Sequence, residues 1–157
     1  MLNRISISSL LTLLFFAVSV QAQSLCQAVS NNDLALAAAL INAGADPNQA
    51  DTTGQTPLLI ATMNGDVPMA TLLLDNGADV NLPGPNAQTP LMHAAALSFI
   101  DLIDLYIDRQ ADPLLLDDQQ MSAFDHAAES NAVSGTIGSI TVDPDAVYAR
   151  LYLAMNP

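Results

Sequence analysis

The stretch NAGADPN at residues 42–48 returns in altered form as DNGADVN at 75–81, and again as DRQADPL at 108–114. Gly44 and Gly77 hold the same place in the first two copies, 33 residues apart, and one more step of 33 reaches Gln110. A fixed period of this length is typical of a solenoid, in which each short unit packs only on its neighbours. The sequence therefore predicts a stack of similar units.

The same period applies to the segment that opens each unit. Thr56-Pro57-Leu58 recurs as Thr89-Pro90-Leu91 and, with three substitutions, as Ser122-Ala123-Phe124. A threonine hydroxyl can accept a hydrogen bond from a free backbone N–H at a helix start, and proline at the first helical position removes no helical bond. Each triplet therefore predicts the start of a first helix.

Two further columns predict where helices end. Glycine and asparagine tolerate the left-handed conformation that closes a helix. The first such column holds Asn32, Gly65, Ser98 and Asn131. A second apolar helix follows it, as in Val67–Asp75 and Ile100–Asp108, and closes at the column of Gly44, Gly77 and Gln110. The segment after it, such as 78–88, is rich in Asn, Pro and Gly, which indicates a loop.

Each unit thus consists of a helix, a turn, a second helix and a loop, and T-P-L opens the first helix. At a period of 33 residues, this arrangement resembles the ankyrin repeat. The best-matching stretches are GQTPLLIATMNGD at 54–66 and LLLDNGADVN at 72–81. The resemblance implies an all-α ankyrin-repeat solenoid over residues 23–157, with about four units and an irregular C-terminal capping repeat. The expected units are 23–55, 56–88, 89–121 and 122–157.

The chain departs from the family pattern in two columns. The family usually has a histidine after T-P-L, which helps to tie neighbouring loops together; here the column holds Cys26, Leu59, Met92 and Asp125. We therefore expect weaker hydrogen bonding between loops, with packing in its place. Gln110 replaces a glycine, at a cost of about 1 kcal/mol in a left-handed conformation. Repeat three is therefore expected to be less rigid.

The second helix of the last unit is displaced. The period places the counterpart of Asp66 at residue 132, but the best-matching helix start, Asp143-Pro144-Asp145, lies 11 residues later. The inserted stretch 132–142, AVSGTIGSITV, predicts a long loop or small hairpin that either completes the cap or binds a partner. The closing helix then has two i, i+4 rows, formed by Val147 and Leu151 and by Tyr148, Tyr152 and Met155.

Residues 1–22 have the features of a secretory signal peptide. One charge, Arg4, precedes the apolar run Leu10–Val18, and Val20 and Ala22 resemble a small-residue cleavage site. We expect cleavage after Ala22 and an exported mature chain, with a retained membrane anchor as the alternative. Because the sequence contains no N-x-[ST] sequon, the periplasm of a bacterium, or secretion from it, is favoured.

The charge of the expected mature chain, 23–157, excludes two classes of partner. Two arginines, Arg109 and Arg150, stand against 16 aspartates and glutamates, a formal charge of −14. Nucleic acids and anionic membrane surfaces are therefore repelled. We expect a monomer that binds another protein through a basic patch on that protein.

Few side chains could support catalysis or hold a metal. His93 and His126 share one column of adjacent first helices, either as structural residues or as a pair that holds a metal or haem, although two ligands make a weak site. Cys26 is the only cysteine and is expected to be a packed thiol. The remaining candidates are aspartates: Asp101, Asp104 and Asp108 on a solvated helix face, and Asp46, Asp79 and Asp112 as acceptors for loop N–H groups. We therefore expect neither a cofactor nor enzymatic activity.

The resemblance implies that a partner docks on the loop tips and on the first-helix surface beside them. By column, the tips are Thr52, Thr53, Gln55, Pro85, Asn86, Gln88, Asp118, Gln119 and Met121. The groove positions are Met63, Asn64, Ala96, Leu97, Glu129 and Ser130. We therefore favour a non-enzymatic adaptor in an exported compartment. The alternatives are an inhibitor or immunity-type protein that neutralises a basic toxin or enzyme, and a haem or metal carrier that uses the two histidines.

Overall fold

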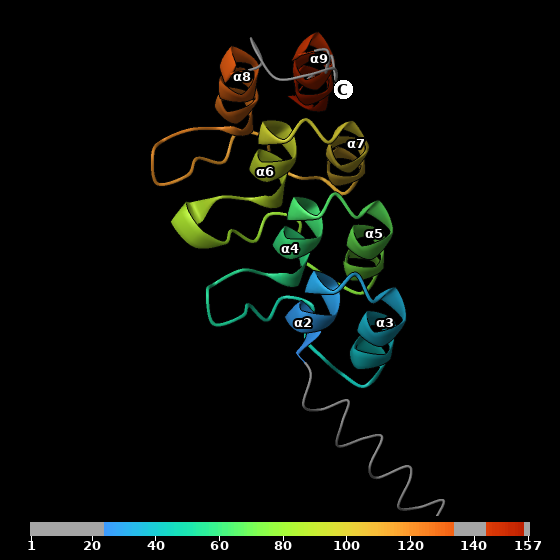
Figure 1. Cartoon of the computed structure of the whole chain (residues 1–157). Helices are drawn as coiled ribbons and strands as arrows, with labels where there is room; N and C mark the ends of the chain where they lie inside the picture. The colour runs from blue at the N-terminus through green and yellow to red at the C-terminus, as the bar shows by residue number, and fades with distance from the viewer. Residues whose placement is uncertain (1–23, 134–143, 156–157) are drawn as a thin grey trace, which may run out of the picture.

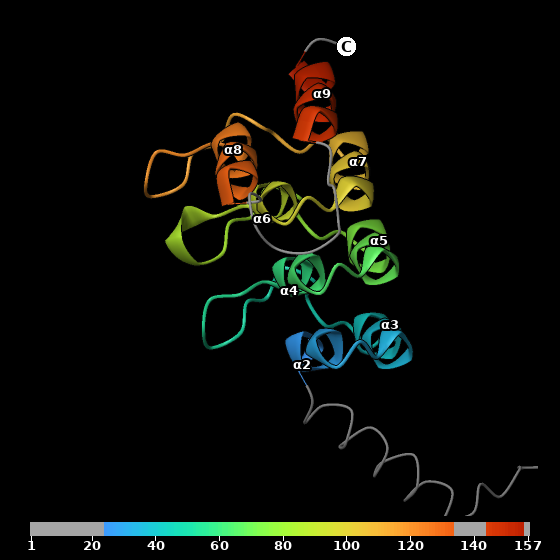
Figure 2. The same ribbon diagram turned by 45° about the horizontal axis from the view of Figure 1, so that its top comes forward.

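The computed structural model describes residues 24–133 and 144–155, and in these ranges the chain forms eight α-helices and no β-strand. Figure 1 and Figure 2 show the helices stacked in two layers. The inner layer contains α2 (Leu25–Ser30), α4 (Pro57–Met63), α6 (Pro90–Ala96) and α8 (Ala123–Val133). The outer layer contains α3 (Leu34–Asn42), α5 (Val67–Asp75), α7 (Ile100–Asp108) and α9 (Pro144–Met155). The predicted all-α solenoid is thus confirmed.

The inner helices begin as the T-P pairs predict. The Thr56 hydroxyl accepts a hydrogen bond from the backbone N–H of Leu59 at 3.2 Å, and the Thr89 hydroxyl accepts one from Met92 at 3.3 Å. Proline follows as the first helical residue in both helices. In the first pair the cap is Ser24, one residue later than the column predicts. The period therefore places the inner helices to within one residue.

The turns between inner and outer helices are left-handed where the column predicts them. The backbone φ angle is 54° at Asn32, 66° at Gly65 and 56° at Ser98. The outer helices α5 and α7 then have the bounds that the sequence predicted. A side chain caps α5, because Asp66 accepts a hydrogen bond from the N–H of Met69 at 2.9 Å.

The core lies between the two layers and continues from pair to pair. Each inner helix packs on its own outer helix and on the next inner helix, so that α4 contacts α2, α5 and α6. Leu58, Leu73 and Leu91 are fully buried in this core. One polar contact crosses it, a 2.6 Å hydrogen bond between the hydroxyls of Thr62 in α4 and Tyr106 in α7. This bond leaves neither buried hydroxyl unsatisfied.

Asparagine side chains tie the loops after the outer helices to one another. Asn48 donates to the carbonyl of Gly77 at 3.0 Å and accepts from the N–H of Asp79 at 2.7 Å. One loop further on, Asn81 accepts from the N–H of Asp112 at 2.8 Å. The loops are therefore hydrogen-bonded to each other by asparagines, although the family histidine is missing. The sequence analysis did not identify this role.

The three loop aspartates act as predicted. Each accepts a hydrogen bond at 2.9 Å from the backbone N–H two residues on; the pairs are Asp46 with Asn48, Asp79 with Asn81, and Asp112 with Leu114. These bonds form Asx turns that fix the start of each loop.

The histidine column is filled in a different way in each repeat. Leu59 is buried, and its Cδ2 lies only 2.3 Å from the place where a Cβ on Gly84 would stand. The Met92 sulfur accepts a hydrogen bond from the Thr89 N–H at 3.3 Å. A side chain at position 84 would therefore require the end of the buried Leu59 side chain to move.

The last pair departs from the prediction in its inner helix. We expected Asn131 to end this helix, but α8 continues through Asn131 to Val133, so the prediction is wrong. Asparagine tolerates a left-handed turn without imposing one, so its presence alone does not end a helix. The outer helix α9 begins at Pro144, as predicted. Most of the predicted insertion, residues 134–142, lies outside the described residues.

The contacts of the closing helix α9 include a buried apolar row, an ion pair and a ring contact of Tyr148 with Phe124 of α8. Val147 and Leu151 are buried, whereas Tyr152, in the second predicted row, is 61% exposed. The guanidinium of Arg150 pairs with the carboxylate of Asp104 in α7. Because α9 contacts both α7 and α8, it closes the described stack at its C-terminal end.

Positive backbone φ angles also occur where the outer helices end. They are 95° at Gly44, 92° at Gly77 and 64° at Gln110. Gln110 therefore adopts the left-handed conformation that is unfavourable for a residue with a Cβ. No helix within the described part of the chain has the length and apolar character needed to cross a bilayer.

Candidate protein-binding surface

The loops that join successive helix pairs project on the side of the inner helices (Figure 1). Most of the tip residues that the sequence singled out are exposed: Thr52, Thr53, Pro85, Asn86, Asp118 and Gln119. Three others, Gln55, Gln88 and Met121, are half-buried. The tips therefore offer a polar, accessible edge along the inner layer.

Two aspartates shape the first and third tips. Asp51 accepts hydrogen bonds from the N–H groups of Thr53 at 2.8 Å and Gln55 at 3.0 Å. Asp117 accepts in the same way from Gln119 at 2.8 Å and Met121 at 3.0 Å. The backbones of Gln55 and Met121 therefore hold their own loops together, a role that the sequence did not reveal.

The second tip has a different conformation. It is a short 3₁₀ turn, Pro85–Ala87, in which Asn86 and Ala87 have φ angles of 59° and 58°. A left-handed alanine costs about 1 kcal/mol, and such strain in exposed loops is often associated with a binding role. The carbonyl of Asn86 accepts from the N–H of Asp118 at 3.0 Å, so the second and third tips touch.

The C-terminal ends of the inner helices add apolar surface. Met63 is 45% exposed and Leu97 is 47% exposed, while Ala96 is half-buried. Asn64 is exposed, but its side-chain amide already donates to Asn32 Oδ1 at 2.9 Å. Glu129 of α8 is exposed, and the side chain of Ser130 lies outside the described residues. The predicted groove positions therefore form a surface that is apolar at its middle.

Positive charge in the described residues is confined to the outer helices. Arg109 pairs with Asp75 at 2.7 Å, and Arg150 pairs with Asp104. Both ion pairs join neighbouring outer helices, where exposure limits their stabilising effect. Asp101 and Asp108, the other members of the predicted aspartate stripe, are exposed on the same layer. Their solvation agrees with the prediction.

The loops and inner helices carry carboxylates without a neighbouring lysine or arginine among the described residues. Backbone N–H groups, Met121 first, lower the pKa of Asp117 to about 2. The hydroxyl of Thr53 lowers the pKa of Asp51, and that of Ser122 lowers the pKa of Asp125. These groups therefore stay ionised at neutral pH. With exposed Asp118 and Glu129, they make the loop side negative.

One of the two histidines has a polar partner, and the other is half-buried. His126 Nε2 lies 2.9 Å from Asp117 Oδ2, which is buried beneath the third tip. His93 is half-buried in α6, and burial, followed by the nearby His126, lowers its pKa. No group of three or more His, Cys, Asp or Glu side chains that could hold a metal occurs within residues 24–133 and 144–155. The geometry therefore favours the structural interpretation of the pair.

The single cysteine is packed, as predicted. Cys26 is 5% exposed, and its thiol donates weakly to the carbonyls of Gln49 at 3.5 Å and Gln55 at 3.7 Å. Burial, followed by the charge of Asp51, raises the pKa of this thiol to about 11. The thiol is therefore protonated at neutral pH and is a poor nucleophile.

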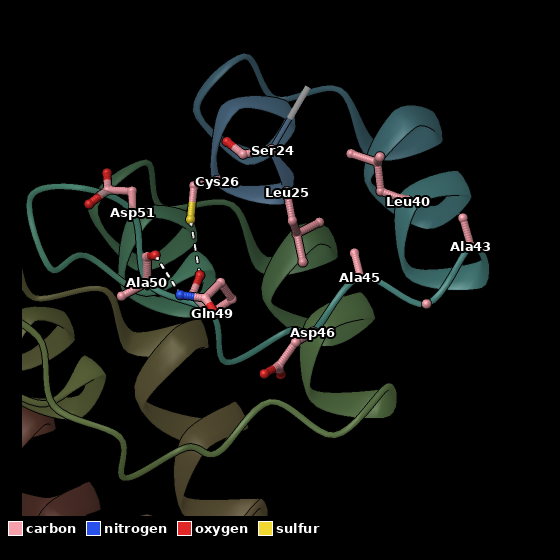
Figure 3. A pocket seen from close by; sticks show the side chains of 11 residues that line it. Ser24, Leu25, Cys26, Leu40, Ala43, Ala45, Asp46, Gln49, Ala50 and Asp51 are labelled. Carbon is pink, nitrogen blue, oxygen red and sulfur yellow. Dashed lines mark hydrogen bonds between the residues drawn. The ribbon is translucent and has the colours of Figure 1, made fainter. Parts of the chain in front are cut away.

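A cavity that the sequence did not reveal lies at the N-terminal end of the described stack. It has a volume of about 420 Å³ and is formed by the start of α2, the end of α3 and the following loop (Figure 3). The residues that line it include Leu25, Leu40, Asp46 and Asp51. The available signal was indirect, because within the described residues no helix pair precedes α2.

Comparison with known families supports the fold and the repeat pattern. The family of ankyrin repeats, described as three copies, matches residues 25–117. A comparison with curated proteins gives no match. Ankyrin repeats generally bind other proteins and are generally non-enzymatic, which agrees with the exposed loop tips. With the helix pairs, the capped T-P starts and the left-handed turns, this match shows that the chain belongs to the ankyrin-repeat family.

Proposed function

We propose that this chain is an exported, monomeric adaptor that binds a basic surface of another protein with its loop tips and inner-helix ends. The supporting observation is the uneven distribution of positive charge between the two layers, both of which carry aspartates. Both described arginines are paired on the outer helices, whereas the loops and inner helices carry ionised carboxylates. A partner with a positive patch is therefore attracted to the loop side.

The surface contains two kinds of contact with different kinetic roles. The exposed carboxylate of Asp118 acts over a distance and raises the association rate. Met63 and Leu97 can bury apolar area once the partner has docked, so they slow dissociation. The strained tip at Pro85–Ala87 lies beside Asp118, where a partner can contact both.

The test begins with capture of the partner from the exported fraction of the native cell, followed by surface plasmon resonance at several salt concentrations. Asp118→Lys should slow association about threefold and flatten its salt dependence, because charge steering is screened beyond about 10 Å at 0.1 M salt. Leu97→Asp should speed dissociation about tenfold. Neither change should lower the melting temperature, since both side chains are exposed.

Asp101→Lys is the matched control, because it makes the same charge change on an exposed position of α7 in the outer layer. It should alter association less than Asp118→Lys does. If both lysine substitutions slow association equally, the net charge of the protein attracts the partner and no particular face is involved. Wild-type binding by Asp118→Lys and Leu97→Asp would reject this surface and leave the 132–142 stretch as the candidate.

The compartment is part of the proposal and has its own test. The apolar run Leu10–Val18 and the small residues before Gln23 support export with removal of residues 1–22. N-terminal sequencing of the protein from the exported fraction should begin at Gln23. Full-length chain in the cytosol would reject export without affecting the binding surface.

An inhibitor or immunity-type protein would use the same surface and the same charge of −14. It would differ from an adaptor in its effect on the partner. A partner enzyme or toxin would lose its activity when the complex forms, at a one-to-one ratio. An adaptor would leave that activity unchanged. An activity titration of the captured partner therefore separates the two functions.

A further inference from the structure

The cavity at the N-terminal end of the stack occupies a place that is filled in the central repeats. In α4 and α6 the counterparts of Leu25 are Leu58 and Leu91, each of which is 1% exposed. There the preceding helix pair covers that side, because α2 packs on α4 and α4 packs on α6. Within the described residues no helix pair precedes α2, so the equivalent space remains open as a cavity of about 420 Å³. A cavity of this size can take one or two side chains of another molecule.

The wall of the cavity combines apolar and acidic groups. Figure 3 shows side chains from α2, α3 and the loop after α3 gathered around it. The apolar part comes from Leu25, Leu40, Ala43, Ala45 and Ala50. The charged part comes from Asp46 and Asp51.

Among the described residues, no arginine pairs with these two aspartates. Arg109 and Arg150 do not line the cavity, and both are bound to aspartates of other elements, Asp75 and Asp104. Asp46 and Asp51 accept hydrogen bonds from loop N–H groups, which fix their position and leave their charge uncompensated. A ligand with an apolar part and a positive charge complements both halves of the wall.

The cavity also continues toward the proposed binding surface. An adjoining hollow of about 450 Å³ shares Ser24, Cys26, Ala50 and Asp51 with it and extends to Thr52, at the first loop tip. A protein that docks along the tips therefore reaches the cavity without crossing the body of the repeat.

We propose that this end cavity is a second contact site, which receives an apolar side chain flanked by a lysine or arginine of a basic partner protein. The apolar side chain lies against Leu25 and Leu40, and the cation lies at one of the two acidic residues, Asp46 or Asp51. This site is separate from the groove around Met63 and Leu97, so it can be tested without knowing the partner.

The test uses hexylammonium chloride as the probe, because it joins a short apolar chain to one positive charge. In a titration followed by amide resonances in ¹H–¹⁵N spectra, the probe should shift Gly44, Ala45 and Ala50 and saturate with a dissociation constant on the order of 1 mM. Hexanol, without a charge, should bind about fivefold more weakly, the usual value of one exposed ion pair. Hexanoate should cause no shift in these residues.

A charge-neutral double variant tests the acidic part of the wall. Asp46→Asn with Asp51→Asn keeps the Oδ1 acceptors of both loop turns, so the fold is retained and only the charge is removed. Hexylammonium should then bind about as weakly as hexanol binds the native protein. Asp79→Asn is the matched control, because it removes one carboxylate from the same column one repeat further on, away from the cavity. It should leave binding unchanged.

Three results would overturn the inference. Equal affinity for hexylammonium and hexanol would show that the carboxylates play no part. Shifts spread over the whole surface would show unspecific attraction to an acidic protein. Shifts of Gly44 and Ala50 on dilution of the protein alone would show that a second copy of the chain fills the cavity.

Discussion

The central helix pairs and the C-terminal pair are joined to their neighbours by different contacts. Between the central loops, a backbone N–H of one loop donates to an asparagine of the loop before it, from Asp79 to Asn48 and from Asp112 to Asn81. The next position in this column is Leu114, which is 60% exposed and ends the series. The last pair is held instead by side chains, through the pairs Arg150 with Asp104 and His126 with Asp117.

This difference follows from what each unit has beside it. A central loop has a similar loop on either side, so one asparagine per repeat can serve the same function again. After the third repeat the outer helix is displaced to Pro144, and the next loop of the series is missing from the described residues. The contacts of α8 and α9 are therefore particular to this pair, and we expect them to open independently of the centre.

The largest effect is expected from removing a buried leucine in each region. Leu73 and Leu151 are both 0% exposed, and replacement of a buried leucine by alanine costs about 3 kcal/mol. Leu73→Ala should lower the global free energy of unfolding by that amount in urea. Leu151→Ala should remove hydrogen-exchange protection from α8 and α9 while α4 and α5 keep theirs. Uniform loss of protection in both variants would mean that the stack unfolds as one unit.

The next effect compares two ends of outer helices. Gly77 has a φ of 92° and open space around its Cβ position, so Gly77→Val should cost about 2 kcal/mol through backbone strain alone. Gln110→Gly should change stability by less than about 0.5 kcal/mol, because relief of left-handed strain offsets the greater flexibility of the unfolded chain. Denaturation midpoints measure both changes. Similar losses would contradict the shared backbone conformation at these two positions.

A smaller effect is expected in the asparagine series. Asn81→Leu removes the acceptor for the N–H of Asp112 and should cost about 1 kcal/mol. The reverse substitution, Leu114→Asn, is made where the asparagine series ends. It should change the free energy of unfolding by less than about 0.5 kcal/mol, as substitutions at most exposed positions do. A loss after Leu114→Asn as large as that after Asn81→Leu would show that position 114 also has a partner.

The last comparison is one of pH dependence and concerns the carboxylate that supports the last pair. The folded protein holds the pKa of Asp117 at about 2, below its usual 3.8, so its ionised form stabilises the fold above pH 3.8. That contribution is lost as the pH falls from about 4 to about 2. Asp117→Asn keeps an oxygen acceptor but removes the charge, so it should be less stable than the native protein at pH 7 and should lose less stability over that acid range. Asp101→Asn on exposed α7 is the control, and an equally reduced acid loss there would contradict a special role for Asp117.

The sequence predicted those parts of the fold that repeat. The columns with Thr56 and Thr89 placed α4 and α6, and the apolar runs gave the bounds of α5 and α7, because each signal occurs in several copies. Asn131 failed as a helix end because the turn depends on the element that follows, and a column does not contain that information. Ser24 caps α2 in place of Gln23, the residue at the expected position. The reason is again local, because serine is a better helix cap than glutamine.

The location of the candidate binding surface was predictable from the sequence, but the contacts made by its individual side chains were less so. Thr52, Pro85, Asn86 and Asp118 are exposed on the tips as expected, because loop position follows from the period. The period does not show that Gln88 donates to Asp117 within the protein. Nor does it show the end cavity, which lies where no helix pair precedes α2 within the described residues.

The contact between Leu59 and Gly84 limits how such a protein can gain or lose repeats. A Cβ at position 84 would stand 2.3 Å from the end of the leucine side chain, so a larger residue there requires that side chain to move. A duplication or deletion whose junction falls between them would place leucine opposite the aspartate that occupies the same column at positions 51 and 117. We therefore expect a junction within residues 59–84 to be tolerated less well than one outside them, for a reason that the length of the period does not contain.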